Sequence, residues 1–366
     1  MTIAYDLRYA CDHFVGIATY AHAVLDALLT LPGDERYVVL WDPRQRQSRF
    51  ELSGLRSHPR VAWVEKPFAP LGLLAMARVG AWLRALGPAA YFSPFHLLPF
   101  RPACPCIVTI HDVRPLRYIS ELSPWRLAPY RWGLVRATRA RVIVTVSEFS
   151  RQEVLAMLPA VPDRVRTVHP GVHQGLRRAE PRRPDGMPSR EFGLVVGDNR
   201  PHKNLSVLAR AWSRLGDPPP LELVAVGPTH GRYPGLTELA RRSGARAVHL
   251  GRRTDAELAW LYANATIMLF PSLYEGFGSP LVEALQQGVP AVVSDIPAFR
   301  EIADGAARFV PPHSPEAWAA EVRRLLADGD ERVRLAAAGR RRAAELSYRR
   351  TAEGILAILR REVAAR

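Results

Sequence analysis

The sequence has 366 residues, of which 48% are hydrophobic and 23% are charged, and its formal net charge is +15 at pH 7. A chain of this length is longer than a domain with a single hydrophobic core usually is, which predicts two domains of similar size. Lysine occurs only at Lys66 and Lys203, and no zinc-finger, RNA-recognition or helix-turn-helix pattern accompanies the arginines, so the charge does not indicate a nucleic-acid partner.

The N-terminal half alternates apolar strand patterns with helix patterns. Residues 16–31 predict an amphipathic helix, and Ser147 is expected to cap a helix that follows the fourth strand pattern. The strand patterns occupy residues 2–7, 36–42, 106–113 and the start of 141–150. Strands that alternate with helices predict a parallel sheet.

A second series of the same kind begins near residue 190. Two such series predict an α/β chain of two Rossmann-like, doubly wound domains that face a central cleft. The segment 175–190 is rich in Pro, Gly and Arg and is the expected linker between domains 1–180 and 190–348. Residues 349–366 predict a helix that packs back across the domain junction. The strand patterns of this series are 192–199, 221–228, 247–251, 265–272 and 290–295.

Basic residues concentrate in the first domain. Residues 51–150 hold 13 Lys and Arg against five acidic residues, a net charge of +8. Within them, segment 70–87 fits a helix that places Arg78, Arg84 and Trp82 among apolar residues. Two interpretations are open: a helix that rests on an anionic membrane surface, or an ordinary amphipathic core helix.

Several features indicate a cytoplasmic protein. No apolar run reaches the roughly 18 residues of a membrane span, and the first residues lack a signal-peptide pattern. The three cysteines, Cys11, Cys104 and Cys106, are odd in number and have no metal-binding spacing, which favours reduced thiols. We expect a cytoplasmic location, with the protein peripheral at the inner face of the membrane if the segment 70–87 binds there.

The most informative string is "FPSLYEGFGSPLVEAL", because ligands of open parallel sheets bind beyond the carboxyl ends of the strands. Its glycines let the backbone approach a ligand closely, and Pro280 suits the first turn of a helix whose N-terminus can hold a diphosphate. Glu275 lies in the predicted loop, near the group attached to that phosphate. Glu283 lies on the helix, where its carboxylate can accept hydrogen bonds from a ribose. The alternative is a glycine-rich turn with two solvated glutamates.

A second candidate site is "VGDNRPHKNL", in which Arg200 and Lys203 follow a strand and precede a helix. Both can neutralise a diphosphate whose charge grows as it leaves. No phosphate-loop motif is present, and the Asp-x-Asp of residues 328–330 lies between helix patterns, where a solvated turn is expected. We therefore predict no metal and no cofactor.

Two weaker candidates lie in the first domain. His111 ends a buried strand, where its carbonyl or imidazole can orient sugar hydroxyls, and Asp112 is expected to position the loop that follows. Gly16 begins a turn at the start of the first helix, which can admit an acceptor or a phosphate. A plain core histidine and a plain helix start are the alternative interpretations.

With these residues assembled, the chain resembles the GT4 family of retaining glycosyltransferases, which have the GT-B fold. The resemblance rests on the E-x7-E string Glu275–Glu283, and on "TIHDVRPLRY", "TVSEFSR", "VHPGV" and "HKNL", which occur in family order. It covers essentially the whole chain and is strongest toward bacterial polysaccharide-assembly mannosyltransferases.

The resemblance implies a role for each candidate residue. It places the transferred sugar on Glu275, the nucleotide ribose on Glu283, the diphosphate on Lys203 and the active-site histidine on His111. It further implies that backbone amides of the turn hold the sugar and phosphate, and these belong to Phe277, Gly278 and Ser279.

The chain departs from the family pattern at three positions. Many members carry an arginine where this chain has Asp198, and Arg200 is the expected substitute. The first helix begins Gly16-Ile17-Ala18 instead of Gly-Ile-Gly, and His173 replaces a family aspartate.

The expected activity is metal-independent transfer of a sugar from a nucleotide diphosphate donor to a glycan or lipid-linked acceptor, with the anomeric configuration retained. GDP-mannose is the favoured donor, while UDP and dTDP sugars stay open. The alternatives are a nucleotide-sugar epimerase on the same architecture and a non-catalytic two-domain protein that binds sugar nucleotides.

Overall fold

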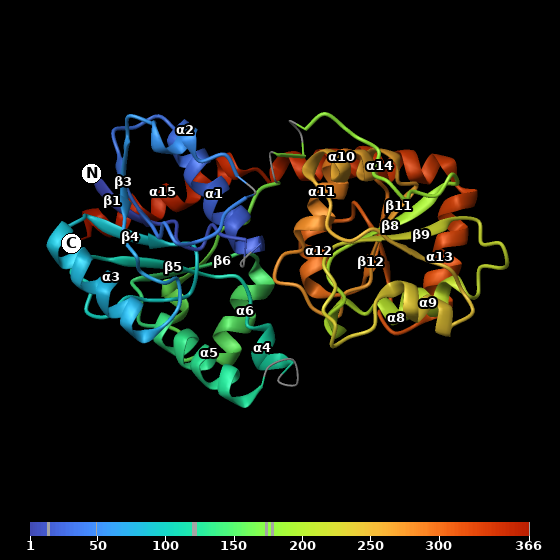
Figure 1. Cartoon of the computed structure of the whole chain (residues 1–366), viewed down its shortest axis with the longest axis horizontal. Coiled ribbons are helices and arrows are strands. Elements are labelled where there is room, and N and C mark those ends of the chain that lie inside the picture. Colours follow the sequence, from blue (N-terminus) through green and yellow to red (C-terminus); the bar gives the residue numbers. More distant parts are fainter. Residues whose placement is uncertain (13–14, 49, 119–122, 173–174, 177–178, 366) are drawn as a thin grey trace. The chain divides into compact units, whose positions relative to one another are not determined.

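The computed structural model describes the chain except for residues 13–14, 49, 119–122, 173–174, 177–178 and 366. The described residues form two compact units, each built on one parallel sheet (Figure 1). Unit 1 comprises residues 1–171 and 347–366, and unit 2 comprises residues 172–346.

Unit 1 has a seven-stranded parallel sheet in the order β3-β2-β1-β4-β5-β6-β7. Its two faces carry different residues because side chains alternate along each strand. On β1, Ile3 and Tyr5 pack toward α1 and α15, whereas Ala4 packs toward α3, α5 and α6. The elements are β1 Thr2–Asp6, α1 Val15–Thr30, β2 Arg36–Trp41, α2 Ser53–Arg56, β3 Val61–Glu65, α3 Leu73–Leu86, β4 Ala90–Ser93, β5 Cys106–Ile110, α4 Arg114–Arg117, α5 Pro124–Ala137, β6 Val142–Thr145, α6 Glu148–Met157, η2 Pro162–Arg164, β7 Val165–Thr167 and α15 Tyr348–Ala364.

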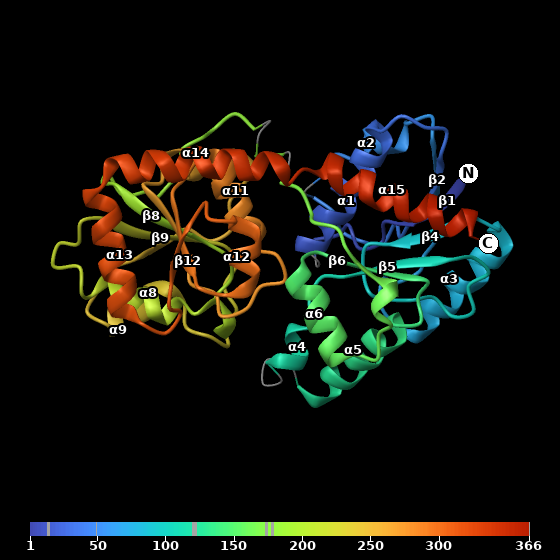
Figure 2. The same cartoon turned by 180° about the vertical axis from the view of Figure 1, so that it is seen from behind.

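The C-terminal helix α15 belongs to unit 1, although the whole of unit 2 precedes it in the sequence. Figure 2 shows α15 alongside α1, and buried residues of both helices, including Ile355 and Leu359, share one core. Two ion pairs fix the helix at its far end: Arg360 to the buried Glu35, and Arg141 to Glu362, each at 2.6 Å.

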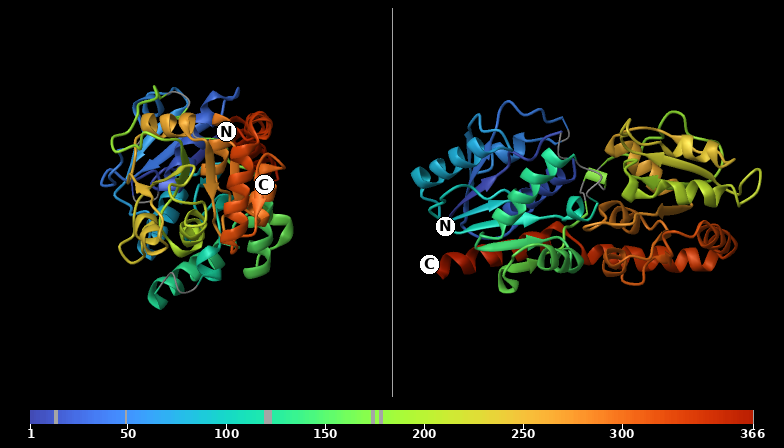
Figure 3. Two further views of the ribbon diagram at one scale, coloured as in Figure 1. Left: turned by 90° about the vertical axis from the view of Figure 1, so that its right-hand side faces the viewer. Right: turned by 90° about the horizontal axis from the view of Figure 1, so that it is seen from below.

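Unit 2 has a six-stranded parallel sheet in the order β10-β9-β8-β11-β12-β13. Helices α8, α9 and α13 pack on one face, and α10, α11 and α12 lie on the other. Figure 3 shows the ribbon from two further directions. The elements are β8 Phe192–Val196, η3 Pro201–Lys203, α8 Leu205–Trp212, β9 Glu222–Val226, α9 Leu236–Arg242, β10 Val248–His249, α10 Asp255–Asn264, β11 Ile267–Phe270, α11 Ser279–Gln287, β12 Ala291–Ser294, α12 Pro297–Ala303, β13 Arg308–Val310, α13 Pro315–Ala327 and α14 Gly329–Glu345.

The predicted class of fold is confirmed: both sheets are parallel, and helices cover both faces of each. The strands are shorter than the apolar patterns, since β5 ends at Ile110 rather than 113 and β6 ends at Thr145. Ser147 accepts a hydrogen bond from the amide of Ser150 and caps α6, as expected. Four strands were not predicted from the sequence, namely β3, β4, β7 and β13.

The segment 175–190, expected to be a linker, lies within unit 2 where it is described. The amide of Arg182 donates to the carbonyl of Ala256, and the Arg183 guanidinium lies 5.7 Å from the centre of the Trp260 ring. This part of the segment therefore packs against α10.

Candidate functional site

The carboxyl ends of β8 and β11 bring together two candidates from separate parts of unit 2. These strands pair directly at the centre of the sheet, so the loops that follow them are neighbours. The Lys203 ammonium, at the end of η3, donates to Glu275 Oε1 at 2.6 Å. Both side chains are largely buried, and Lys203 Nζ also lies 5.2 Å from the centre of the Phe270 ring. The pairing of these two candidates was not predicted from the sequence.

Glu275 is held as a carboxylate by its surroundings. Burial raises the pKa of Glu275, but the charges of Lys203 and His202 and hydrogen bonds from Lys203 and Ser272 outweigh burial and bring the pKa below its ordinary value. The Ser272 hydroxyl donates to the same Oε1 at 2.7 Å. The carboxylate is thus oriented by two donors before any ligand is present.

The turn between the two glutamates requires glycine at one position. Gly278 has φ +90°, and a Cβ there would lie 2.8 Å from the Phe299 ring. It forms the N-cap of α11, which begins at Ser279 with Pro280 in its first turn. The structure therefore has a helix N-terminus next to Glu275, with the exposed Ser279 and the buried Phe277 on either side of Gly278.

Glu283 lies on α11 and contacts a residue that sequence reasoning missed. Tyr262 of α10 donates its hydroxyl to Glu283 Oε2 at 2.8 Å. Tyr262 is buried, and burial together with the charge of Glu283 raises the pKa of the Tyr262 phenol, so it acts as a donor. The hydrogen bond orients the carboxylate that was assigned to a ribose. No motif links the two residues, because they belong to successive helices.

Arg200 contacts Asp198 through both its backbone and its side chain. The amide of Arg200 donates to Asp198 Oδ1 at 3.1 Å, and its Nε lies 3.5 Å from Asp198 Oδ2. The side chain of Arg200 remains more than one-third exposed. Arg200 and Lys203 thus lie on the same short loop, as the sequence predicted.

In unit 1, His111 follows β5 and is fixed on two sides. Its Nε2 lies 2.8 Å from the carbonyl oxygen of Pro94, and the Tyr20 ring meets the imidazole edge-on at 4.9 Å. Its own carbonyl accepts a hydrogen bond from the Ser150 hydroxyl. Burial lowers the pKa of His111, only partly opposed by the Pro94 carbonyl and Asp112, so the imidazole is neutral at pH 7.

The remaining candidates have clear structural surroundings. Asp112 accepts from the amide of Arg114 and positions the start of α4, as expected. Gly16 is the second residue of α1, and a Cβ there would meet no atom within 4 Å, so packing does not demand glycine. Asp328 caps α14 through the amide of Glu331, and Asp330 lies in the first turn of that helix, so the Asp-x-Asp forms a helix start instead of the expected solvated turn. His173 lies outside the described residues.

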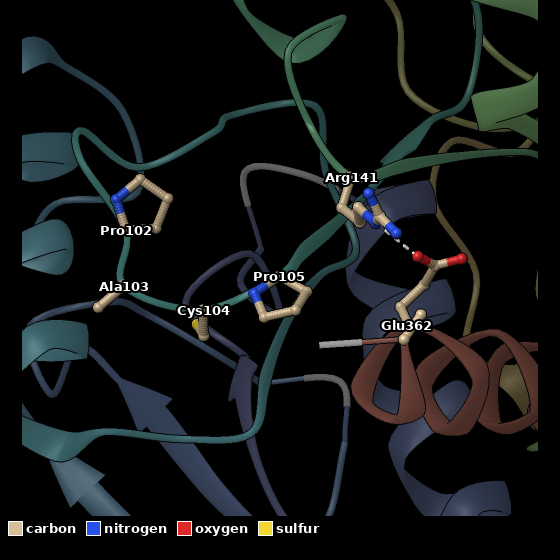
Figure 4. Close-up of a pocket in the computed structure, with 7 residues that line it drawn as sticks. Pro102, Ala103, Cys104, Pro105, Arg141 and Glu362 are labelled. Carbon is tan, nitrogen blue, oxygen red and sulfur yellow. Dashed lines mark hydrogen bonds and ion pairs between the residues drawn. The ribbon is translucent and has the colours of Figure 1, made fainter.

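A hollow in unit 1 lies at the opposite edge of its sheet from these candidates. Its volume is about 360 Å³, and Figure 4 shows Arg141 and Glu362 paired on one side of it. It lies at the amino ends of β5 and β6, whereas ligands of parallel sheets bind at the carboxyl ends. We therefore do not assign it to the site. The lining residues are Pro102, Ala103, Cys104, Pro105, Arg141, Glu362 and Ala365.

Comparison with known families covers both units. Residues 15–174 match the family described as Glycosyltransferase Family 4, and residues 179–342 match Glycosyl transferases group 1. Together the two matches contain every candidate residue and all strands of both sheets except β1.

Two curated relatives are mannosyltransferases. The chain is 28% identical over 294 residues to O-antigen chain mannosyltransferase B of Escherichia coli, covering 73% of each protein. It is 33% identical over 275 residues to MMP alpha-(1->4)-mannosyltransferase of Mycolicibacterium hassiacum, covering 71% of this chain and 66% of that protein.

The fold matches a solved structure over nearly its whole length. HepE of Anabaena, solved in complex with UDP-glucose, superposes with a TM-score of 0.74 at 17% identity, covering 98% of this chain and 99% of that one. At this identity the match establishes the GT-B fold alone.

Proposed function

Because the chain belongs to the GT4 family of group 1 retaining glycosyltransferases, we propose that it transfers mannose from GDP-mannose to a glycan or lipid-linked acceptor in surface-polysaccharide assembly. The name of the Escherichia coli relative supports the sugar and the pathway class. The two alternatives, an epimerase and a non-catalytic binding protein, gain no support from either family match. The donor assigned here is the first part of the proposal to test.

The observation that carries the proposed chemistry is the buried Lys203–Glu275 pair beside the N-terminus of α11. Unit 2 binds the donor with its diphosphate at Lys203, Arg200 and the first amides of α11, where the helix dipole favours negative charge. Glu275 contacts the transferred sugar, and Glu283, oriented by Tyr262, accepts hydrogen bonds from the ribose.

In the reaction, the bond between the anomeric carbon and the diphosphate oxygen breaks. The acceptor oxygen bonds to that carbon from the same face, and its proton passes to the leaving diphosphate. Lys203, Arg200 and the α11 amides stabilise the charge that collects on the diphosphate, so this scheme uses no metal. Unit 1 binds the acceptor, and the neutral His111 accepts or donates a hydrogen bond to a sugar hydroxyl without adding charge.

The acceptor is supplied at a membrane surface in this proposal. The start of α3 and the loop before it expose three apolar side chains, Leu71, Leu73 and Leu74, with exposed fractions of 47%, 61% and 63%. They line a hollow of about 230 Å³ that is flanked by Arg44 and Arg78. Apolar side chains with arginines beside them suit the interface of an anionic bilayer.

Helix α5 adds a second surface of the same character. It contains no acidic residue, and it exposes Trp125 and Trp132, seven positions apart, together with Arg126 and Arg131. Further along α3, Val79 and Leu83 are buried, so the core interpretation holds for the middle of that helix. No helix among the described residues is long and apolar enough to cross a bilayer.

A donor screen tests the proposal directly. GDP-mannose, UDP-glucose and dTDP-glucose are incubated with the protein and with lipid-linked acceptors extracted from bacterial membranes, and transferred sugar is measured. We expect transfer from GDP-mannose, and at most slow hydrolysis when donor is given alone. Transfer from another donor would refute mannose, and an isomerised nucleotide sugar in the donor-only reaction would refute transferase activity.

A further inference from the structure

The proposed diphosphate site contains a carboxylate that a phosphate-binding loop would not be expected to have. Asp198 directly follows Gly197 at the end of β8, where the family resemblance leads one to expect an arginine. Burial raises the pKa of Asp198, but the charges of Lys203 and Arg200 and the hydrogen bond from the Arg200 amide outweigh burial. The pKa therefore lies below its ordinary value, and the group is ionised. The site therefore carries negative charge next to the ligand it is proposed to bind.

The loop after β9 is fastened to the loop that holds Asp198. Asn199, which is buried, receives a hydrogen bond from the amide of His230 at 2.6 Å and donates to the carbonyls of His230 and Tyr233. The backbones at the ends of β8 and β9 also pack closely, since a Cβ on Gly227 would lie 2.0 Å from the carbonyl oxygen of Gly197. The position of His230 is thus set by the same loop that carries Arg200 and Lys203.

The hydrogen bonds of Asn199 place the His230 imidazole beside the carboxylate of Asp198. His230 Nε2 lies 3.5 Å from Asp198 Oδ2, the same separation as that of Arg200 Nε from this oxygen. The His230 side chain is 39% exposed, so a ligand at the end of the sheet can reach it. Asp198 therefore lies between a guanidinium and a histidine that can become a cation.

The balance of charge around the proposed diphosphate site leaves room for a further cation. Asp198 and Glu275 offset Arg200 and Lys203, so these four groups together are neutral while His230 is neutral. The diphosphate of a nucleotide sugar brings fixed negative charge into this cluster, and imidazole is the side chain that takes up a proton near neutral pH.

We propose that His230, held beside Asp198, contacts the donor diphosphate and takes up a proton when the donor binds. This inference rests on the proposed function. It makes His230 a donor-binding residue that supplies the charge otherwise expected from an arginine at position 198. Asp198 then has a positioning role, since its carboxylate lies 3.5 Å from the imidazole and can pair with it.

Other charged and titratable groups near His230 lie on three elements. Asp198, Arg200, His202 and Lys203 belong to the loop after β8, and Arg232 and Tyr233 follow on the loop of His230 itself. From β10, His249 contacts the carbonyl of Gly227 where that loop begins. Arg232 lies 5.6 Å from the centre of the Tyr233 ring. Arg232 therefore provides a matched cation for a control on the same loop.

The test is isothermal titration calorimetry of the full chain with GDP-mannose, UDP-glucose and dTDP-glucose from pH 6 to pH 8.5. Each phosphate of these probes has one ester bond and one anhydride bond, and its single acid group stays ionised throughout this range, so proton uptake belongs to the protein. Repeating each titration in buffers of different ionisation enthalpy gives the number of protons taken up. We expect the best probe to bind more tightly as pH falls, with a fraction of a proton taken up near pH 7.5.

His230→Gln should remove the proton uptake and weaken binding roughly tenfold at pH 6.5, with little loss at pH 8.5. Asp198→Asn should flatten the pH dependence while leaving binding at pH 8.5 equal or tighter, because it removes a repelling charge. In turnover assays, His230→Gln should raise KM for the donor and leave kcat within about twofold.

The controls separate this inference from loss of structure and from the proposed function. Arg232→Gln, which removes a neighbouring cation, should keep the wild-type pH dependence. If His230→Gln also keeps it, or if Asp198→Asn weakens binding equally at every pH, the inference is overturned and the proposed function stands. If the wild-type chain binds none of the three probes while Lys203→Ala behaves identically, the proposed function falls and the inference with it.

Discussion

At the residue scale, the Lys203–Glu275 pair makes the first prediction. Lys203→Ala removes the ammonium proposed to neutralise the leaving diphosphate, and Glu275→Ala removes the carboxylate proposed to contact the sugar. We expect each change to lower kcat/KM by about 10²–10³-fold, the range measured when a transition-state contact is lost. Lys66→Ala, at the only other lysine and exposed in unit 1, should leave the rate unchanged. Turnover near the wild-type rate in both variants would contradict the site assignment.

The same pair predicts how stability depends on pH. The pKa of folded Glu275 is depressed, so its contribution to stability is fully present above the unfolded value of about 4.3 and is lost as pH falls through the folded value. In Lys203→Met, burial of the carboxylate acts without its partner. We expect the melting temperature of this variant to lie below that of the wild type at pH 7. The difference should narrow as pH falls below about 4, and thermal melts from pH 3 to pH 7 would check it.

Tyr262 makes a third prediction at the same scale. Tyr262→Phe keeps the ring in its buried place and deletes only the hydroxyl that donates to Glu283. If Glu283 holds the ribose, a carboxylate that is less well oriented should raise KM for the donor severalfold with little change in kcat. Steady-state kinetics measures both constants, and Tyr233→Phe, on the loop after β9, is the matched control. An unchanged KM would indicate that the hydrogen bond has only a structural role.

The residues of the site differ in how well the sequence predicts them. Glu275, Gly278 and Glu283 lie within nine positions, so one string contains the turn, the helix start and both carboxylates. The partners Tyr262 and His230 could not be found this way. They meet Glu283 and Asp198 because of the order of strands and the packing of helices, and neither is visible in a local pattern.

At the element scale, the start of α11 depends on one glycine. Gly278→Ala would add a Cβ 2.8 Å from the Phe299 ring at a backbone angle of φ +90°, so both sterics and conformation oppose it. We expect a loss of about 3 kcal/mol together with donor binding. Gly305→Ala, at φ +79° with no atom within 4 Å, carries only the conformational cost of about 1 kcal/mol. Chemical denaturation would compare them, and equal losses would contradict the role of Phe299.

The first turn of α3 makes the prediction about membranes. Leu73→Glu with Leu74→Glu places charge on side chains that are already exposed, so the fold should persist. Flotation with vesicles containing anionic lipid should recover the wild-type chain and lose the double variant. Val333→Glu, at an equally exposed position on α14, should float like the wild type. Recovery that is the same with purely zwitterionic vesicles would refute an anionic surface.

Most strands that are buried on both faces were predicted, and the exception is β4, whose four buried residues form only a short run. Strands β5, β8 and β11 read as continuous apolar runs because helices cover them on each side. Strands β7 and β13 have three residues each and lie at sheet edges, too short to give a pattern. Strand β3 is also an edge strand, and its partly exposed residues give no apolar run.

At the scale of the whole molecule, the chain crosses between its units twice. It leaves unit 1 at Gly171, completes unit 2 without interruption, and returns at Ser347. The helix pattern near the end of the sequence was apparent, but its partner was not. The buried residues of α15 meet α1, from which more than 300 residues separate them in the chain. Such a pairing follows from tertiary packing and from no local property of either helix.

This arrangement predicts that the last residues stabilise the first strand. Leu359→Ala removes a fully buried side chain from the core shared by α1, α15 and β1, at a cost of about 2–5 kcal/mol. Hydrogen exchange should therefore quicken in β1 and β5 of unit 1 and stay unchanged in β8 and β11 of unit 2, because α15 contributes nothing to the latter core. Val333→Ala, at an exposed position on α14, should alter neither. Equal loss of protection in both sheets would mean that the two units unfold as one, whereas loss confined to unit 1 would show that α15 supports the unit to which it returns.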